Sequence, residues 1–171
     1  MAYIPAHVAN SFLFQARLEG ILDIDPLKIQ KLVYFLHGWH LATRDAPAVG
    51  ERFQAWPYGP VLASLYHEFK SNPASQEGHG ANPIEGYARE IDPVSGKFRS
   101  LKISRDDIAF YDVFDRVWRR YKGMTGLSLS TLTHADGTPW KKSRDAGDMY
   151  LSDDDIKNYF RKLAIGQDSN E

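Results

Sequence analysis

Apolar residues recur every three or four positions over several stretches of the chain, which is the spacing of one buried helix face. This pattern predicts helices over residues 6–19, 26–41, 60–71, 108–121 and 153–163, with shorter helical pieces at 127–134 and 139–144. Asp25 followed by Pro26 is a typical helix start, because aspartate caps the first free amides and proline suits the first turn. The helix that follows is apolar nearly all round, so we expect it to be the central one.

Shorter elements complete the predicted fold. Residues 51–56 alternate weakly enough to indicate a brief strand, and residues 57–60 form a turn after which Pro60 opens the next helix. The stretch 89–103 surrounds a turn-rich sequence and predicts a β-hairpin, which we expect to share one small antiparallel sheet with the Phe53 region. Ser104 and Asp107 resemble a capping box for the helix at 108.

The whole chain, residues 1–171, is therefore predicted to be one compact, mainly α-helical domain with a small antiparallel β element, an α+β variant of a helical fold. Its core is expected to span residues 5–165. Residues 71–86 hold little that could be buried and predict a mobile surface loop, and residues 166–171 are expected to fray.

Composition narrows the possible classes of protein. The chain contains 43% hydrophobic and 25% charged residues, 21 Lys and Arg against 22 Asp and Glu, and no cysteine. These values are typical of a globular domain and exclude disulfides and thiolate metal sites. The first twenty residues do not resemble a signal peptide, and no stretch approaches the roughly 20 apolar residues that cross a bilayer. We therefore expect a cytoplasmic protein without a membrane partner.

Catalytic and metal-binding chemistry find little support in the sequence. His37 and His40 lie three residues apart on one helix and could bind a metal with His67 or His134, but no HExxH-type spacing accompanies them. The hydroxyl-rich stretch 128–136 contains the residue types of a hydrolase without a GxSxG elbow. We expect no metal, no cofactor and no enzymatic activity, and keep a hydrolase or metalloenzyme as the third hypothesis.

Two basic clusters are interleaved with aromatic residues, as on a nucleic-acid-binding surface. The acidic residues before the first cluster favour an ordinary solvated helix face with paired charges instead. A nucleic-acid-binding regulator is therefore the second hypothesis. Its candidate residues are Arg116, Arg119, Arg120, Lys122, Lys141, Lys142 and Arg144.

Three segments taken together resemble the Panacea antitoxin family, whose members are also described as SocA-like or GepA-like phage-associated proteins. The segments are LKIQKLVYFLHGWHLA at 27–42, FQAWPYGPVLASLYHEF at 53–69 and LTHADGTPWKKSR at 132–144. The family pattern has a helix beginning LKLQKLLYY with a later Gly-Trp, then an AWxYGPV turn, then a TH…PW motif. Ile29 and Phe35 depart from it conservatively, and the resemblance covers roughly residues 8–163.

The resemblance implies a bacterial or phage antitoxin that acts in the cytoplasm. Such a protein binds and neutralises a cognate protein toxin, and in the SocA-like branch it presents the toxin to a protease. An aromatic-rich helical domain suits recognition, because Trp, Tyr and Arg supply much of the binding energy at protein interfaces. This is the first hypothesis.

Several motif residues are candidates for contact with the partner, whereas Leu32, Leu36 and Trp39 are expected in the core. Lys28 and Lys31 are the most unusual, because lysine is rarely buried without a partner. We expect a polar groove beside the core, lined by Lys28, Gln30, Lys31, Tyr34 and Tyr58 with His134 nearby. The predicted partner-binding residues are Lys28, Gln30, Lys31, Tyr34, Trp56, Tyr58, His134 and Trp140.

Overall fold

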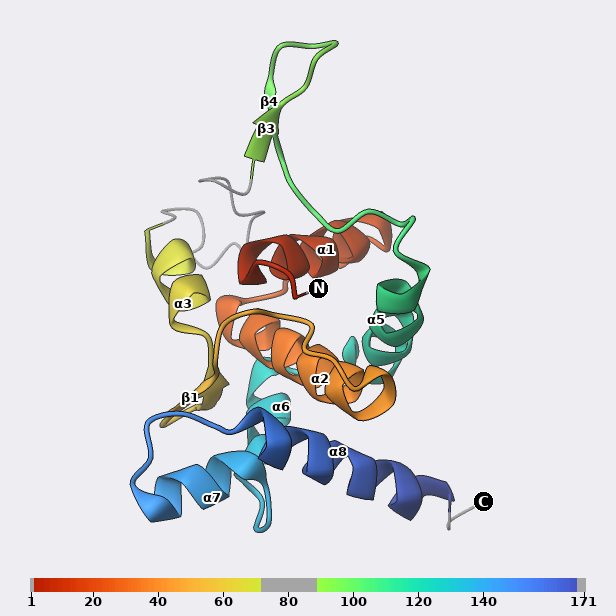
Figure 1. The fold of residues 1–171 in the computed structure, drawn as a ribbon. Coiled ribbons are helices and arrows are strands. Elements are labelled where there is room, and N and C mark those ends of the chain that lie inside the picture. The colour runs from red at the N-terminus through yellow and green to blue at the C-terminus, as the bar shows by residue number, and fades with distance from the viewer. Residues whose placement is uncertain (1, 72–88, 169–171) are drawn as a thin grey trace.

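Helix α2 (Pro26–Arg44) lies in the middle of the computed structural model, which describes residues 2–71 and 89–168, and the other helices pack around it (Figure 1). Its start is the predicted one, since the Asp25 side chain accepts a hydrogen bond from the Lys28 amide at 2.8 Å. Its main packing partners are α8 (Asp153–Asp168), α5 (Ile108–Tyr121), α6 (Gly126–His134) and α1 (Pro5–Leu18). The chain is thus mainly α-helical, as predicted.

The core forms on both sides of α2. Leu32 and Leu36 are fully buried, as expected, while Trp39 is partly buried against the same core. On one side, Phe12 of α1 stacks on Phe114 of α5 with ring centroids 4.4 Å apart. Helix α5 is capped by Asp107, which accepts from the Phe110 amide at 3.0 Å, so Ser104 is not its cap.

Gly38 allows α8 to approach α2 closely. A Cβ atom built on Gly38 would lie 2.2 Å from Cε2 of Phe160, a buried ring of α8. Real Cβ atoms do not approach other carbons so closely, so any larger residue would push the two helices apart. The glycine of the Gly-Trp motif therefore has a packing role.

The β structure differs from the predicted single sheet. Strand β1 (Gln54–Trp56) pairs antiparallel with β2 (Gly59–Val61), with Gln54 opposite Val61 and Trp56 opposite Gly59. Pro60 is therefore in a strand, and α3 (Ala63–Lys70) begins three residues after it. The predicted hairpin is confirmed as β3 (Arg89–Ile91) paired with β4 (Phe98–Ser100), but it forms a separate sheet that projects from the helical body (Figure 1).

The two short helical pieces are also confirmed, as α6 and as α7 (Pro139–Ala146). Helix α8 continues to Asp168, beyond the predicted end of the last helix. The predicted mobile loop at 71–86 lies, apart from Ser71, outside the described residues, as do positions 169–171 of the predicted tail. Over the described ranges, none of the helices combines the length and apolar character needed to cross a bilayer.

Candidate functional site

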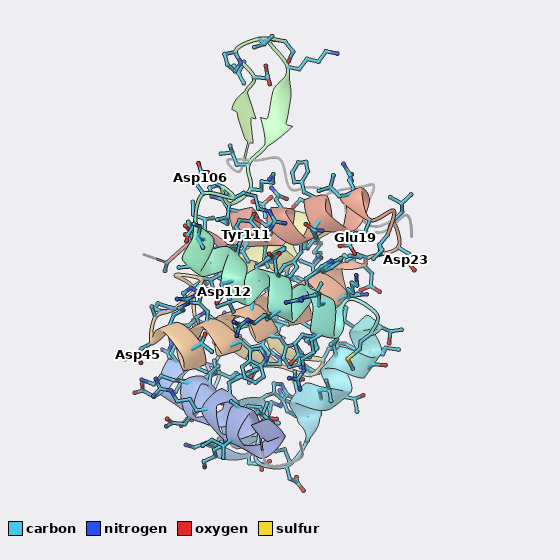
Figure 2. The ribbon with its side chains drawn as sticks, turned by 90° about the vertical axis from the view of Figure 1, so that its right-hand side faces the viewer. Glu19, Asp23, Asp45, Asp106, Tyr111 and Asp112 are labelled. Carbon is cyan, nitrogen blue, oxygen red and sulfur yellow. The ribbon has the colours of Figure 1, made fainter. Side chains whose placement is uncertain are left out.

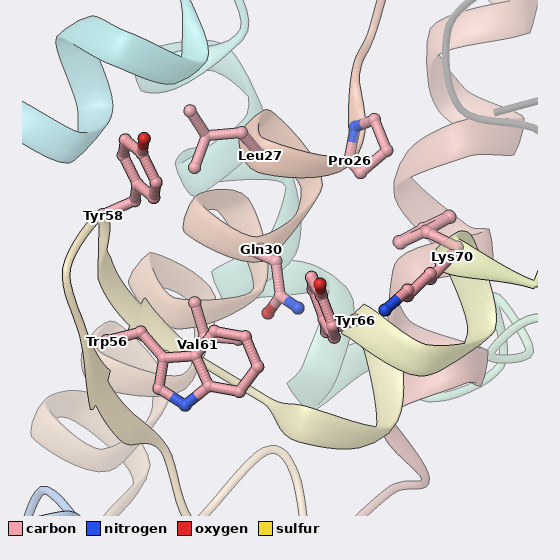
Figure 3. A pocket seen from close by; sticks show the side chains of 9 residues that line it. Pro26, Leu27, Gln30, Trp56, Tyr58, Val61, Tyr66 and Lys70 are labelled. Carbon is pink, nitrogen blue, oxygen red and sulfur yellow. The ribbon is translucent and has the colours of Figure 1, made fainter. Parts of the chain in front are cut away.

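An apolar hollow of about 340 Å³ lies where the start of α2 meets the β1–β2 hairpin and α3 (Figure 3). We call it the hairpin pocket. Its lining is almost entirely carbon, in keeping with sites that bind apolar groups. The lining residues are Pro26, Leu27, Gln30, Trp56, Tyr58, Val61, Tyr66, Phe69 and Lys70.

Three aromatic residues, Trp56, Tyr58 and Tyr66, line much of the hairpin pocket. Tyr58 at the hairpin tip is 67% exposed and Tyr66 on α3 is 40% exposed, although both are large and mostly apolar. Trp56 packs edge-on against Tyr66 with ring centroids 4.8 Å apart, and its indole nitrogen donates to the Gln54 side chain at 2.8 Å. A ring that a neighbour holds in this way, as Trp56 holds Tyr66, loses little conformational freedom when a partner covers it.

Gln30 holds the far end of the hairpin to α2. Its side-chain amide donates to the Leu62 carbonyl at 3.0 Å, and its carbonyl accepts from the Leu62 amide at 2.9 Å. Both backbone groups are buried and lie just past the β1–β2 ladder, so this glutamine supplies the bonds that a third strand would otherwise make.

Lys31 holds the middle of the hairpin. Its ammonium nitrogen is fully buried and donates to the Pro60 carbonyl at 2.9 Å. Burial disfavours the charged amine and lowers the pKa of Lys31 to about 7. The hairpin passes directly over this side chain at Gly59, which has φ +108° and where an added Cβ would lie 2.6 Å from Thr133 Oγ1.

Helices α6 and α7 hold the same hairpin from behind. The Ser130 hydroxyl donates to the Tyr58 carbonyl at 3.0 Å, and the Trp140 indole donates to the Trp56 carbonyl at 2.7 Å. One guanidinium nitrogen of Arg144 donates to the Ala55 carbonyl at 3.1 Å. With the bond from Lys31, a side chain from outside the hairpin contacts the backbone carbonyl of each of four hairpin residues, which fixes the position of the loop that carries Tyr58.

His134 stacks on Trp140 with ring centroids 4.1 Å apart. The pKa of His134 is lowered mainly by burial, with smaller contributions from the charges of Lys31 and Arg144. Its Nε2 atom is buried and has no hydrogen-bond partner among the residues that the structure describes. The ring therefore packs as a neutral aromatic group behind the hairpin.

The structure brings together only part of the predicted partner-binding set. Gln30, Trp56 and Tyr58 line the hairpin pocket, whereas His134 and Trp140 lie behind the hairpin. Lys31 and Tyr34 are buried, and Lys28 donates to the Lys122 carbonyl at 2.5 Å.

The prediction of a polar groove is therefore wrong. The side chains of Lys28, Lys31 and Tyr34 are buried, and the hollow beside them has an apolar lining. A lysine stem is long enough to reach a backbone carbonyl through the core, and this possibility was missed. Five further lining residues were not among the predicted ones: Leu27, Val61, Tyr66, Phe69 and Lys70. Tyr66 and Phe69 share the helical stripe that predicted this helix, but helical spacing alone does not show which of its residues border a hollow.

The predicted nucleic-acid residues mostly contact acidic or aromatic neighbours. Arg116 pairs with Asp112, Lys122 with Glu19, Lys141 with Asp145 and Lys142 with Asp155, at N–O distances of 3.3, 2.6, 2.7 and 2.9 Å. Arg119 donates to a backbone carbonyl of its own helix, and Arg144 belongs to the hairpin support described above. These contacts favour the solvated, charge-paired helix face over a phosphate-binding surface, and nucleic-acid binding stays a prediction.

His37, His40 and Thr133, which were candidates for metal binding or catalysis, each contact a different neighbour. His37 contacts Asp153 at 2.8 Å and the Val49 amide at 3.4 Å, while His40 contacts the Ala46 carbonyl at 2.7 Å. The Thr133 hydroxyl donates to the Ser130 carbonyl at 2.7 Å. Within residues 2–71 and 89–168, no three His, Cys, Asp or Glu side chains gather in a way that could hold a metal ion.

A family model described as "Antitoxin SocA-like, Panacea domain" matches residues 29–141, which include most of α2, the β1–β2 hairpin and the supporting helices α6 and, in part, α7. The chain belongs to this family, as its resemblance predicted. Antitoxin SocA of Caulobacter vibrioides (strain NA1000 / CB15N) is a relative, 33% identical over 133 residues. The aligned region covers 78% of this chain and 66%, just under two thirds, of that relative. No solved structure matches the chain.

Proposed function

We propose that this protein is an antitoxin that acts in the cytoplasm by binding and neutralising a cognate protein toxin. Its membership of the SocA-like Panacea family, together with a relative named as an antitoxin, supports this role. The role is non-catalytic, because recognition requires a shaped surface and no reacting group. The hairpin pocket is the observation that carries the proposal.

The toxin contact includes the hairpin pocket, which accepts an apolar side chain of the toxin. Exposed aromatic rings beside an apolar hollow are the usual centre of a protein interface, where a few side chains contribute most of the binding energy. Tyr58 and Tyr66 supply the rings, and Gln30 and Trp56 line the same pocket. The supports from α2, α6 and α7 keep this surface in place before the toxin arrives, which lowers the entropic cost of binding.

The test is co-expression of the chain with the protein encoded by the adjacent gene, with growth rescue and co-purification scored together. Native protein is expected to rescue growth and to form a complex. Tyr66→Arg, which places a charge in the apolar hollow, is expected to abolish both. Tyr150→Arg is the matched control, since Tyr150 is also 40% exposed but does not line the pocket.

Toxin abundance in the rescued cells separates the two routes of neutralisation. Neutralisation by occlusion leaves the toxin level unchanged, with the toxin held in the complex. Presentation to a protease lowers the toxin level, and the level returns when the cytosolic proteases are inhibited. Rescue by Tyr66→Arg as complete as by native protein would remove the pocket from the proposal, and no rescue by native protein with any neighbouring gene would remove the antitoxin role.

A further inference from the structure

A second hollow, of about 250 Å³, lies between α2, α5 and α8 and differs in character from the hairpin pocket. We call it the α5 groove; Figure 2 views the molecule from the side on which α5 faces the reader. Its apolar floor is formed by the indole of Trp39 with Val113 and Val117. The charged residues in its lining are Asp112, Arg116 and Arg120.

The groove carries more positive than negative charge. The carboxylate of Asp112 is shared by two guanidinium groups, those of Arg44 at 2.8 Å and Arg116 at 3.3 Å. No carboxylate of the described residues forms an ion pair with Arg120. The Arg120 guanidinium instead lies over the rings of Trp39 and Tyr121, 5.5 and 5.4 Å from their centroids.

Arg120 is held in a position from which it can bind an anion. The Trp39 indole nitrogen donates to the Tyr121 hydroxyl at 3.0 Å, and the indole packs edge-on against Phe160 with centroids 5.1 Å apart. These contacts fix the aromatic surface under the guanidinium. These cation–π contacts restrain the exposed arginine, and its N–H groups can bind a carboxylate with two parallel hydrogen bonds.

We propose that the α5 groove binds an acidic side chain of the toxin that is flanked by an apolar residue. The carboxylate pairs with Arg120 and the apolar neighbour covers Trp39, Val113 and Val117. Charge complementarity supports this assignment. Arg120 forms no ion pair with the described residues, and the floor of the groove is apolar. The assignment rests on the proposed function and adds a second, charged contact to the apolar one.

A nucleic-acid backbone fits the surroundings of the groove less well. Asp112 lies in the groove itself, and Figure 2 shows further acidic residues across the same view of the molecule, at Glu19, Asp23, Asp45 and Asp106. A run of phosphates leaving Arg120 would meet the Asp112 carboxylate in the groove, whereas a single carboxylate needs only the Arg120 guanidinium. The surroundings therefore favour a protein partner.

The test compares Arg120→Ala with Arg119→Ala in the full-length protein, and the probe is the protein whose toxicity the chain suppresses in the rescue assay. Arg119 is the matched control, because it is the adjacent, exposed arginine of the same helix and does not line the groove. Arg120→Ala is expected to weaken the affinity about tenfold or more, while Arg119→Ala changes it less than about twofold. Arg120→Lys keeps the charge but loses the planar fork, and should lie between them.

Salt dependence and thermal unfolding complete the test. Affinity should fall less steeply with salt in Arg120→Ala than in native protein, because one charge pair is missing. All variants should unfold close to the native temperature, since Arg119 and Arg120 are both exposed.

Equal affinities of Arg120→Ala and Arg119→Ala would overturn the assignment while leaving the antitoxin role intact. Loss of retention on DNA instead of loss of toxin affinity would overturn it in favour of a phosphate ligand. Failure of the native chain to bind or rescue would remove the proposed function, and this assignment with it.

Discussion

The β1–β2 hairpin packs against α2 on its inner face and borders the hairpin pocket on its outer face, and the side chains at the two faces are used in opposite ways. On the inner face, Lys31 and Gln30 are polar but buried, and their hydrogen bonds go to backbone atoms of the hairpin and the residue after it. On the outer face, Tyr58 of the hairpin and Tyr66 of the neighbouring α3 are aromatic but exposed. Each face thus reverses the usual rule that apolar residues lie inside and polar residues outside.

A short motif can therefore contain two kinds of residue: buried ones that hold the hairpin in position, and exposed ones that a partner can contact. The buried polar groups of Gln30 and Lys31 have hydrogen-bond partners, so mutating them should lower the free energy of unfolding. Binding should weaken only as a consequence of that loss of stability. The exposed Tyr58 ring has no hydrogen bond or ring contact with the other described residues, so mutating it should change binding and leave stability unchanged.

Gly59→Ala should produce the largest loss of stability. The backbone at Gly59 has φ +108°, and the added methyl group would also lie within 3 Å of Thr133 Oγ1 and of Cε of Lys31. Backbone strain and overpacking each cost a few kcal/mol, so the free energy of unfolding should fall by roughly 4 kcal/mol. Urea denaturation measures this change.

Gly137→Ala is the control for that experiment. Gly137 also has positive φ, +82°, but an added Cβ would contact nothing within 4 Å. Only the backbone term applies, so the loss should be roughly 1 kcal/mol. Equal losses at the two positions would contradict the tight contact between the hairpin and Lys31.

Lys31 should make stability depend on pH in an unusual direction. Its pKa is about 7 in the folded protein and near its ordinary value of 10.5 in the unfolded chain, so the unfolded chain holds the extra proton between these values. Unfolding free energy therefore rises with pH above 7, by about 1.4 kcal/mol per pH unit, or about 3 kcal/mol between pH 7 and 9.5.

The measurement is the difference in unfolding free energy between native protein and Lys31→Met at several pH values in this window. The difference cancels the titration of other groups. Lys31→Met should be more stable near pH 7 than at pH 9.5 relative to native protein, because methionine carries no desolvated charge. A difference that does not change with pH would mean that the amine stays charged in the folded protein and that its contact with the Pro60 carbonyl is correspondingly stronger.

Much of the fold could be predicted from the sequence because helical periodicity and caps are local signals. The start of α2 at Asp25-Pro26, the apolar stripe of α5 and the β3–β4 turn all follow from residues close to one another in the chain. The β1–β2 pairing could not be predicted, since the bonds that stabilise the hairpin come from α2, α6 and α7, as many as 89 residues away along the sequence.

The candidate site was predicted in part for the same reason. Trp56, Tyr58 and Gln30 belong to the motif segments that drew attention to this region, and they do line one pocket. The orientation of Lys31 could not be inferred, because periodicity assigns a residue to a helix face but does not show which backbone carbonyl its side chain can reach. Tyr66 was missed because a helical stripe beside a hairpin can face either the core or a hollow.

Tyr58→Ala tests the outer face. Because the ring is 67% exposed, its loss should change the free energy of unfolding by less than about 0.5 kcal/mol. Toxin affinity should nevertheless fall about tenfold, which corresponds to about 1.4 kcal/mol, as expected when a central aromatic contact is removed. Calorimetric titration and thermal unfolding of the same preparation measure the two quantities. A drop in stability as large as the drop in affinity would show that Tyr58 belongs to the support of the hairpin.

Arg144→Ala should produce the smallest change, and it distinguishes support of the hairpin from nucleic-acid binding. Arg144 donates to the Ala55 carbonyl and lies 5.7 Å from the Trp140 ring centroid, so its loss should lower the free energy of unfolding by about 1 kcal/mol. Lys142→Ala on the same helix removes only an exposed ion pair with Asp155, and no change in the free energy of unfolding should be measurable.

If these residues formed a phosphate-binding surface, the two variants would instead lose retention on DNA equally, each reducing the salt dependence by about one charge. A stability difference without a difference in DNA retention places Arg144 in the support of the hairpin, where its hydrogen bond helps to hold the strand that leads to Trp56 and Tyr58.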